Sequence, residues 1–277
     1  RDVTIPYTVG GASTASAGDH DLVDSSVVIT AGSPSGTINF TTVDDALDED
    51  PETVVIVMTT ASLVNATAGA ITAHTVTLTD DDATPTVTFA VSEQTVAEAD
   101  GAVSMSVELS AVSGRDVTVP YTVGGTALGS GTDHDLADGS LTIGAGSPTG
   151  AISLNLTPDG LDEDDETIIV SITTAGLINA TEGGVTGHTI TVTDADSAPA
   201  VTFAVDAQSV AEGDGSVSIS VDLAAASGLD ATIPYTVSGA AAASPTDHDL
   251  VDGSLVIGAG EFGGTITFTV ADDALHE

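Results

Sequence analysis

The chain has 277 residues, of which 42 are acidic and only two, Arg1 and Arg115, are basic, so its formal net charge is −40. This charge excludes ordinary nucleic-acid binding and attraction to anionic membranes, because both depend on Lys and Arg. The chain lacks cysteine, which excludes disulfides and thiolate metal sites. Hydrophobic residues still make up 41% and occur in short alternating runs, which indicates a folded protein.

An internal repeat organises the sequence. RDVTIPYTVGG starts at residue 1, RDVTVPYTVGG at residue 115 and LDATIPYTVSG at residue 229, a spacing of 114 residues each time. A unit of this size is a domain, so the chain is an array of domains. We predict the C-terminal part of a module over residues 1–86, a complete module over residues 87–200 and the N-terminal part of a third over residues 201–277. Partial modules at both ends suggest a window on a longer repetitive polypeptide.

The complete module shows β periodicity throughout and no helical periodicity. Seven short strands are predicted, at residues 87–91, 102–109, 117–123, 140–143, 151–156, 167–173 and 188–193. The partial modules repeat the later and the earlier of these strands. This pattern predicts an all-β chain of tandem seven-stranded antiparallel two-sheet β-sandwiches. Pro120 predicts an edge strand or a bulge, because proline donates no ladder hydrogen bond.

The acidic residues gather at four joints between predicted strands, namely those after the first, third, fifth and seventh. Connections of an antiparallel sandwich alternate between its two ends, so these four joints are expected at one end. Carboxylates crowded there repel one another by about 1 kcal/mol per close pair. Calcium relieves such repulsion, since it takes six to eight oxygen ligands from flexible loops. The alternative is a solvated acidic surface that serves solubility or a saline habitat.

Four motifs carry a family resemblance: VTFAVSEQTVAEADGAVSMSVEL, GTALGSGTDHDLADGSLTI, DGLDEDDETIIVSI and HTITVTDAD. In this order and spacing they resemble a Calx-beta domain, and the resemblance extends to both partial modules. It implies calcium-binding β-sandwiches, which are known from sodium–calcium exchangers, an integrin tail and long bacterial surface proteins.

The resemblance also implies metal ligands, position by position. In the complete module these are Glu98, Asp133, Asp159, Glu163, Glu166, Asp194 and Asp196. In the first partial module they are Asp19, Asp44, Asp45, Glu49, Glu52, Asp80 and Asp82. In the last they are Glu212, Asp247, Asp272, Asp273 and Glu277. The pair Asp44–Asp45 becomes Pro158–Asp159 in the complete module, which suggests fewer ions or weaker binding in that copy.

Two other chemistries compete with calcium binding. The histidines of the DHD motifs (His20, His134 and His248) are expected to be surface groups rather than zinc ligands, because zinc needs several nitrogen or sulfur donors. A glycosidase would need a cleft and aromatic platforms besides paired carboxylates, and the chain has no Trp and three Tyr. The chain is therefore expected not to be an enzyme.

These observations predict a calcium-binding structural segment, a stalk or filament, of a long prokaryotic surface or extracellular protein. Its expected partners are calcium, the neighbouring modules and identical chains in a filament or bundle, with no nucleic acid and no membrane contact by this segment. Two alternatives stay open: an adhesive module that recognises glycan or protein, and the calcium-sensing domain of a transporter.

Overall fold

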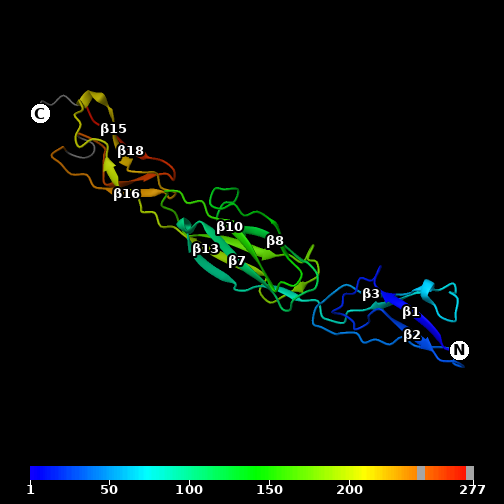
Figure 1. Ribbon diagram of the computed structural model, residues 1–277. Helices are drawn as coiled ribbons and strands as arrows, with labels where there is room; N and C mark the ends of the chain where they lie inside the picture. The colour runs from blue at the N-terminus through cyan, green and yellow to red at the C-terminus, as the bar shows by residue number, and fades with distance from the viewer. Residues whose placement is uncertain (242–246, 273–277) are drawn as a thin grey trace.

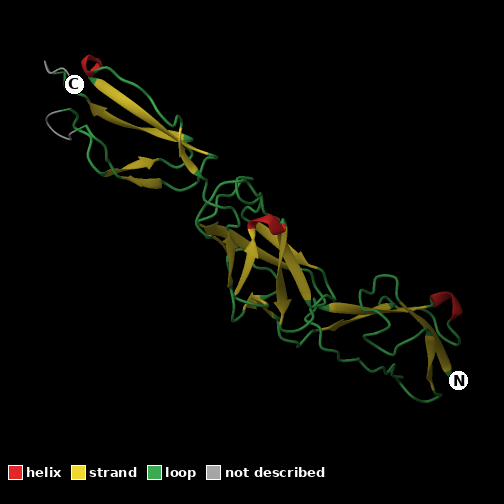
Figure 2. Cartoon of the chain, turned by 90° about the vertical axis from the view of Figure 1, so that its left-hand side faces the viewer, coloured by secondary structure: helices red, strands yellow, loops and turns green. Residues whose placement is uncertain are grey.

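The computed structural model describes residues 1–241 and 247–272, and it shows three β-structured units in line (Figures 1 and 2). We call residues 1–86 module 1, residues 87–200 module 2 and residues 201–277 module 3. Modules 1 and 3 lie at opposite ends of the row, with module 2 between them (Figure 1). The predicted all-β class is confirmed, because strands and a few single 3₁₀ turns are the regular elements of the described chain.

Module 2 consists of two sheets that enclose one hydrophobic core. Its strands are β5 (Thr86–Phe89), β6 (Glu93–Ala97), β7 (Ala102–Leu109), β8 (Val117–Gly125), β9 (Gly139–Ile143), β10 (Thr149–Asn155), β11 (Glu166–Ile172), β12 (Thr181–Glu182) and β13 (Gly187–Thr193). One sheet has the order β10-β7-β5-β12 and the other the order β6-β13-β11-β8-β9. A single 3₁₀ turn, η2 (Glu98–Asp100), connects β6 to β7.

The alternation along β7 shows how the sequence fixes this core. Val103, Met105 and Val107 are buried, whereas the serines between them are exposed, as expected for a strand with one face toward the core. Phe89 from the same sheet and Ile168 from the opposite sheet belong to the same buried cluster. The apolar side chains of both sheets thus fill one layer, and the polar loops are left at the two ends.

All seven predicted strands of module 2 are present, but β6 and β12 were not predicted. Both lie at sheet edges, and both pair in parallel, β6 with β13 and β12 with β5. The sandwich is therefore not purely antiparallel. These two strands are short and polar, so they lack the alternation by which a strand is recognised in a sequence.

The edge position predicted from Pro120 is wrong, because β8 lies between β11 and β9, whereas the alternative of a bulge stays a prediction. Pairing between β8 and β11 starts at Tyr121. The Pro120 carbonyl accepts a hydrogen bond from Thr173 N just beyond β11 (2.9 Å). Since N and O of one strand residue point the same way, the missing N–H of proline faces the end of the ladder, where its loss is tolerated.

Module 1 forms one sheet with the order β2-β1-β3-β4. Its elements are β1 (Val3–Val9), β2 (Ser25–Ile29), β3 (Glu52–Met58), the 3₁₀ turn η1 (Thr60–Ser62) and β4 (Ala73–Leu78). Residues 35–41, which have the repeat positions of β10, form no strand. In module 2, β10 pairs only with β7, and residues 1–86 contain no counterpart of β7. The missing partner explains why this segment stays irregular.

Module 3 shows the complementary case. Its elements are β14 (Val201–Phe203), the 3₁₀ turn η3 (Glu212–Asp214), β15 (Ser216–Leu223), β16 (Ala231–Tyr235), β17 (Gly253–Ile257) and β18 (Gly263–Thr269). The sheets are β14-β15-β18 and β16-β17. Residues 207–211, at the positions of β6, form no strand, because the described residues contain no counterpart of β13 to pair with. No helix in the described chain is long or apolar enough to cross a membrane.

Candidate metal centre

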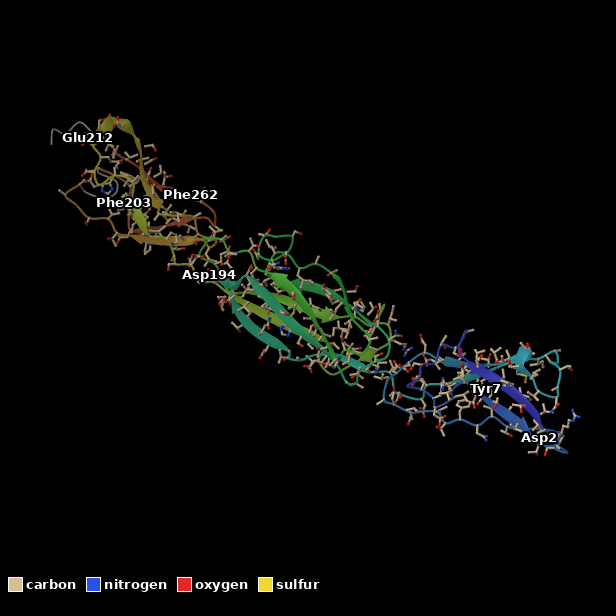
Figure 3. The ribbon with its side chains drawn as sticks, viewed as in Figure 1. Asp2, Tyr7, Asp194, Phe203, Glu212 and Phe262 are labelled. Atoms are coloured by element: carbon tan, nitrogen blue, oxygen red, sulfur yellow. The ribbon has the colours of Figure 1, made fainter. Side chains whose placement is uncertain are left out.

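The acidic loops of module 2 meet at the end that faces module 3, where Figure 3 labels Asp194. Glu98 begins η2, which is closed by a hydrogen bond from Ala97 N to the Asp100 carboxylate (2.9 Å). Gly101 follows with a φ of 72°, a left-handed conformation that glycine adopts without strain. This turn directs the chain into β7 and leaves Glu98 at the end of the sandwich.

Three predicted ligands form the tightest group in module 2. One carboxylate oxygen from each of Glu98, Asp194 and Asp196 lies within 4.8 Å of the others. Glu98 and Asp194 are half-buried, and Asp196 is exposed. Because Asp194 and Asp196 follow β13, this group joins the start and the end of the module.

The acidic loop between β10 and β11 is folded onto this group by backbone hydrogen bonds. Asp159 N donates to Glu98 Oε1 (2.7 Å), and Glu163 N donates to Asp194 Oδ2 (3.2 Å). Leu161 N donates to Asp159 Oδ1 (2.8 Å), which closes a turn within the loop. Asp194 Oδ1 also accepts a hydrogen bond from Asp196 N (3.0 Å), and each ionised carboxylate keeps further lone pairs for a cation.

Glu166 and Asp133 extend the cluster toward the core. Burial raises the pKa of Glu166 from its ordinary value of 4.5 to about 7, and both the charge and the hydrogen bond of Asp133 contribute. Burial likewise raises the pKa of Glu163, with further contributions from Asp159, Asp133, Glu98 and Asp194. All seven residues predicted for module 2 are therefore brought together, although metal binding by them stays a prediction.

The expectation that the DHD histidines are surface groups is wrong for two of them. His134 is 2% exposed and His20 is 7% exposed. In each case Nδ1 accepts a hydrogen bond from the backbone N–H two residues later, Leu136 N (3.2 Å) or Leu22 N (3.1 Å). The ring thus braces the loop that presents the preceding aspartate, which no pattern in the sequence reveals.

Module 1 repeats the arrangement around a cleft of about 500 Å³. Its lining includes all seven predicted ligands of this module: Asp19, Asp44, Asp45, Glu49, Glu52, Asp80 and Asp82. Glu49 N donates to Asp80 Oδ2 (3.2 Å), the same bond that Glu163 makes in module 2. Burial raises the pKa of both Glu49 and Glu52, and neighbouring carboxylates add to the effect.

The tightest group of module 1 includes a residue that was not predicted. Oxygens of Asp44, Asp81 and Asp82 lie within 4.8 Å of one another. Asp81 belongs to the run Asp80–Asp82, whereas the matching residue of module 2 is Ala195. The run of three consecutive aspartates was the feature of the sequence from which Asp81 could have been predicted as a ligand.

A family model for the Calx-beta domain matches this sequence three times, over residues 1–82, 80–196 and 194–277. The chain belongs to the Calx-beta family. The resemblance seen in the sequence is thereby confirmed, and Calx-beta domains are calcium-binding domains. No curated protein matches the sequence.

Several solved structures are similar to this Calx-beta chain. CBD12 from CALX1.2 is 19% identical, covers 67% of this chain and 74% of its own, and has a TM-score of 0.37. The calcium binding domain CBD12 of CALX1.1 is 21% identical over 68% of this chain and 76% of its own, with a TM-score of 0.37. A two-domain protein of unknown function from Bacteroides fragilis NCTC 9343 is 10% identical over 68% and 84%, with a TM-score of 0.31.

The third Calx-beta module is described only in part. Glu212 and Asp247 line one pocket of about 520 Å³, with His248 and Phe268 beside them. Asp272 is exposed and is not among the residues that line this pocket. The predicted ligands Asp273 and Glu277 lie outside the described residues.

The donor set of the two described Calx-beta clusters fits a hard cation. All grouped ligand atoms are carboxylate oxygens, and neither Arg nor Lys is among them. Such oxygen-only sets on flexible loops are those that calcium takes. They do not fit zinc, which prefers nitrogen and sulfur, and the His134 Nδ1 already accepts the Leu136 N–H.

Proposed function

We propose that this chain is a calcium-binding structural segment, a stalk or filament, of a long prokaryotic surface or extracellular protein. The observation that carries this proposal is the placement of the acidic clusters, which lie at module ends next to the following module and contain no cation of their own. Membership of the Calx-beta family supports calcium as the ion. The in-line arrangement of three modules supports a spacer role (Figure 2).

Bound calcium would supply positive charge that joins segments distant in the sequence. In module 2, η2 provides Glu98, the loop before β11 provides Asp159 and Glu163, and the segment after β13 provides Asp194 and Asp196. The last two residues lead directly into module 3. Holding them against the acidic loop restricts the joint, and without calcium like charges push the loop and the joint apart.

Half-burial argues against a merely solvated acidic surface. A carboxylate that serves solubility stays in water with an ordinary pKa, whereas burial and like charges raise the pKa of Glu166 to about 7. The free-energy cost of ionising Glu166 beside Asp133 is relieved when a cation binds both carboxylates.

Exposed aromatic side chains in module 3 give the adhesive alternative little support. Phe203 is 55% exposed, but its repeat counterpart Phe89 is 1% exposed beneath the opposite sheet. Phe89 packs against His188 of β13 (5.5 Å between ring centroids), and the described residues of module 3 contain no counterpart of β13, so Phe203 stands at a core position that is left uncovered. Phe262 is 67% exposed and stands where module 2 has Pro148, a single residue rather than a patch.

Calorimetric titration with calcium, combined with thermal unfolding in EDTA and in millimolar calcium, tests the proposal. We expect calcium to add about 2.7 kcal/mol per site when its free concentration is a hundredfold above the Kd. Glu166→Gln should make the calcium-free chain more stable, since it removes a buried like charge, and should shrink the gain from calcium. Scattering should show a longer, narrower particle in calcium.

The matched control is Glu108→Gln, which changes the same chemical group at an exposed position on β7, away from the cluster. It should leave the titration unchanged. Equal melting temperatures in EDTA and in calcium would refute the calcium site, and equal particle dimensions would refute stiffening.

A further inference from the structure

The joint between modules 1 and 2 is built on a buried aspartate that belongs to the acidic loop of module 1. Asp48 is 5% exposed and forms an isolated β-bridge with Ser113 of module 2, which is 2% exposed. Gly114 N donates to the Asp48 carbonyl (3.1 Å), and Ser113 Oγ donates to the same oxygen (3.4 Å). The loop of one module is therefore docked on a turn of the next by hydrogen bonds to its main chain.

Arg115 neutralises this aspartate across the joint. Its Nη2 forms a salt bridge with Asp48 Oδ2, and its Nη1 contacts Asp50 Oδ1 at 3.2 Å. Thr84 Oγ1 also donates to Asp48 Oδ1 (3.4 Å). The pair with the exposed Asp50 contributes little, whereas a buried carboxylate that loses its cation is left uncompensated. The main electrostatic role of Arg115 is therefore to neutralise the buried Asp48.

The joint between modules 2 and 3 has the same two hydrogen bonds to the aspartate carbonyl but lacks the cation. Gly228 N donates to the Asp162 carbonyl (3.1 Å), and Ser227 Oγ donates to the same oxygen (3.3 Å). Asp162 and Ser227 are the repeat counterparts of Asp48 and Ser113, yet Leu229 stands in the place of Arg115. The described residues form no ion pair across this joint.

The glycine of the docking turn packs closely against a glutamate side chain of the acidic loop in both joints. A Cβ on Gly114 would lie 2.4 Å from Glu49 Cγ, and a Cβ on Gly228 would lie 2.5 Å from Glu163 Cγ. Neither glycine has a left-handed φ, so a larger residue would leave the backbone unstrained but would displace the glutamate side chain of the acidic loop. The Ser-Gly turn is therefore shaped to receive this loop.

We propose that the turn Ser113–Gly114–Arg115 is a docking site for an Asp-Glu-Asp segment of the preceding module, and that the residue at position 115 or 229 sets how firmly each joint is held. The first joint is locked by Arg115, and the second, with Leu229, works as the more compliant joint. The lock needs no metal ion, so it goes beyond the calcium function proposed above.

Distances between paired spin labels on the full chain test this proposal. The chain has no cysteine, so Ser26→Cys with Ser106→Cys reports on the first joint, and Ser106→Cys with Ser218→Cys reports on the second; all three serines are exposed. In EDTA at low salt we expect a narrower distance distribution for the first joint than for the second. Arg115→Leu should broaden the first distribution until it resembles the second.

The reciprocal variant Leu229→Arg should narrow the second distribution, because Asp162 and Asp164 stand where Asp48 and Asp50 stand in the first joint. High salt should reverse that gain. Arg1→Leu removes the same charge far from both joints and should change neither distribution. If neither Arg115→Leu nor Leu229→Arg changes the width of the distance distribution at its joint, the proposal is overturned. Since every measurement is made in EDTA, that result would leave the calcium function untouched.

Discussion

Modules 1 and 2 draw their carboxylates from one repeat but centre them differently. In module 1 the tightest group is Asp44, Asp81 and Asp82, and in module 2 it is Glu98, Asp194 and Asp196. Two positions explain the shift, since Asp44 and Asp81 become Pro158 and Ala195 in module 2. Module 2 has Glu98 instead, for which residues 1–86 contain no counterpart.

The acidic cluster of each module is therefore determined by which loops meet at the module end, and not by one fixed set of residues. Both groups lie where the segment after the last strand meets the acidic loop, and the bond from Glu49 N or Glu163 N to the terminal aspartate is the same in both. The scaffold of loops is thus shared by the two copies, while individual carboxylates are exchanged. The two sites should therefore respond differently to single substitutions.

The largest effect is expected from Glu98→Gln. Glu98 accepts the Asp159 N–H and belongs to the central group of module 2, so the variant should weaken that site by about tenfold or more, in keeping with the dependence of calcium affinity on ligand charge. Module 1 should keep its affinity. Calorimetry should show one class of sites lost and the other unchanged, and loss of both classes would mean that the modules do not bind independently.

A smaller effect is expected from pH. In the folded, calcium-free chain Glu166 binds a proton up to about pH 7, whereas in the unfolded chain it releases it near its ordinary value of 4.5. The folded state then holds more protons between these values, so its stability should fall as the pH rises from about 4.5 through about 7.

Calcium needs the ionised form, so its affinity for module 2 should be about tenfold weaker at pH 6 than at pH 8, with proton release on binding. Titrations in buffers of different ionisation enthalpy measure this release. Glu166→Gln should abolish the part of this proton release that comes from calcium binding to module 2. A proton release that persists in the variant would assign the titration to another group.

The smallest effect is expected from Ala195→Asp, which gives module 2 the third aspartate of module 1. The added charge should raise calcium affinity modestly and lower the stability of the calcium-free chain, because it adds repulsion to an already acidic group. Unfolding in urea with and without calcium measures both changes. Stability that rises in EDTA would show that repulsion among these carboxylates does not govern the stability of the calcium-free chain.

The sequence predicts those parts of the fold that depend on local periodicity. The strand at residues 102–109 was predicted to the residue because its apolar side chains alternate strictly. β6 and β12 could not be recognised, since each exists through a partner about 95 residues away, β13 or β5. The irregular residues 35–41 show the converse, because a segment with the pattern of β10 stays irregular without its partner.

The site was predictable to a similar degree. The rule that alternate connections share one end placed the acidic loops together, and the family resemblance selected residues among them. Burial of His134 depends on a bond to Leu136 N that only the folded loop provides. Asp81 was not predicted because the complete module has alanine at the matching position.

The parallel pairing of β6 with β13 determines how module 2 would respond to a pulling force. β6 lies close to the start of module 2 and β13 close to its end, and residues 93–97 align with residues 189–193. A pull on the two ends of the module loads these hydrogen bonds along the strand direction, so they resist sliding together instead of opening in sequence like a zipper. The module is thus fastened against extension at the two points where force enters and leaves it.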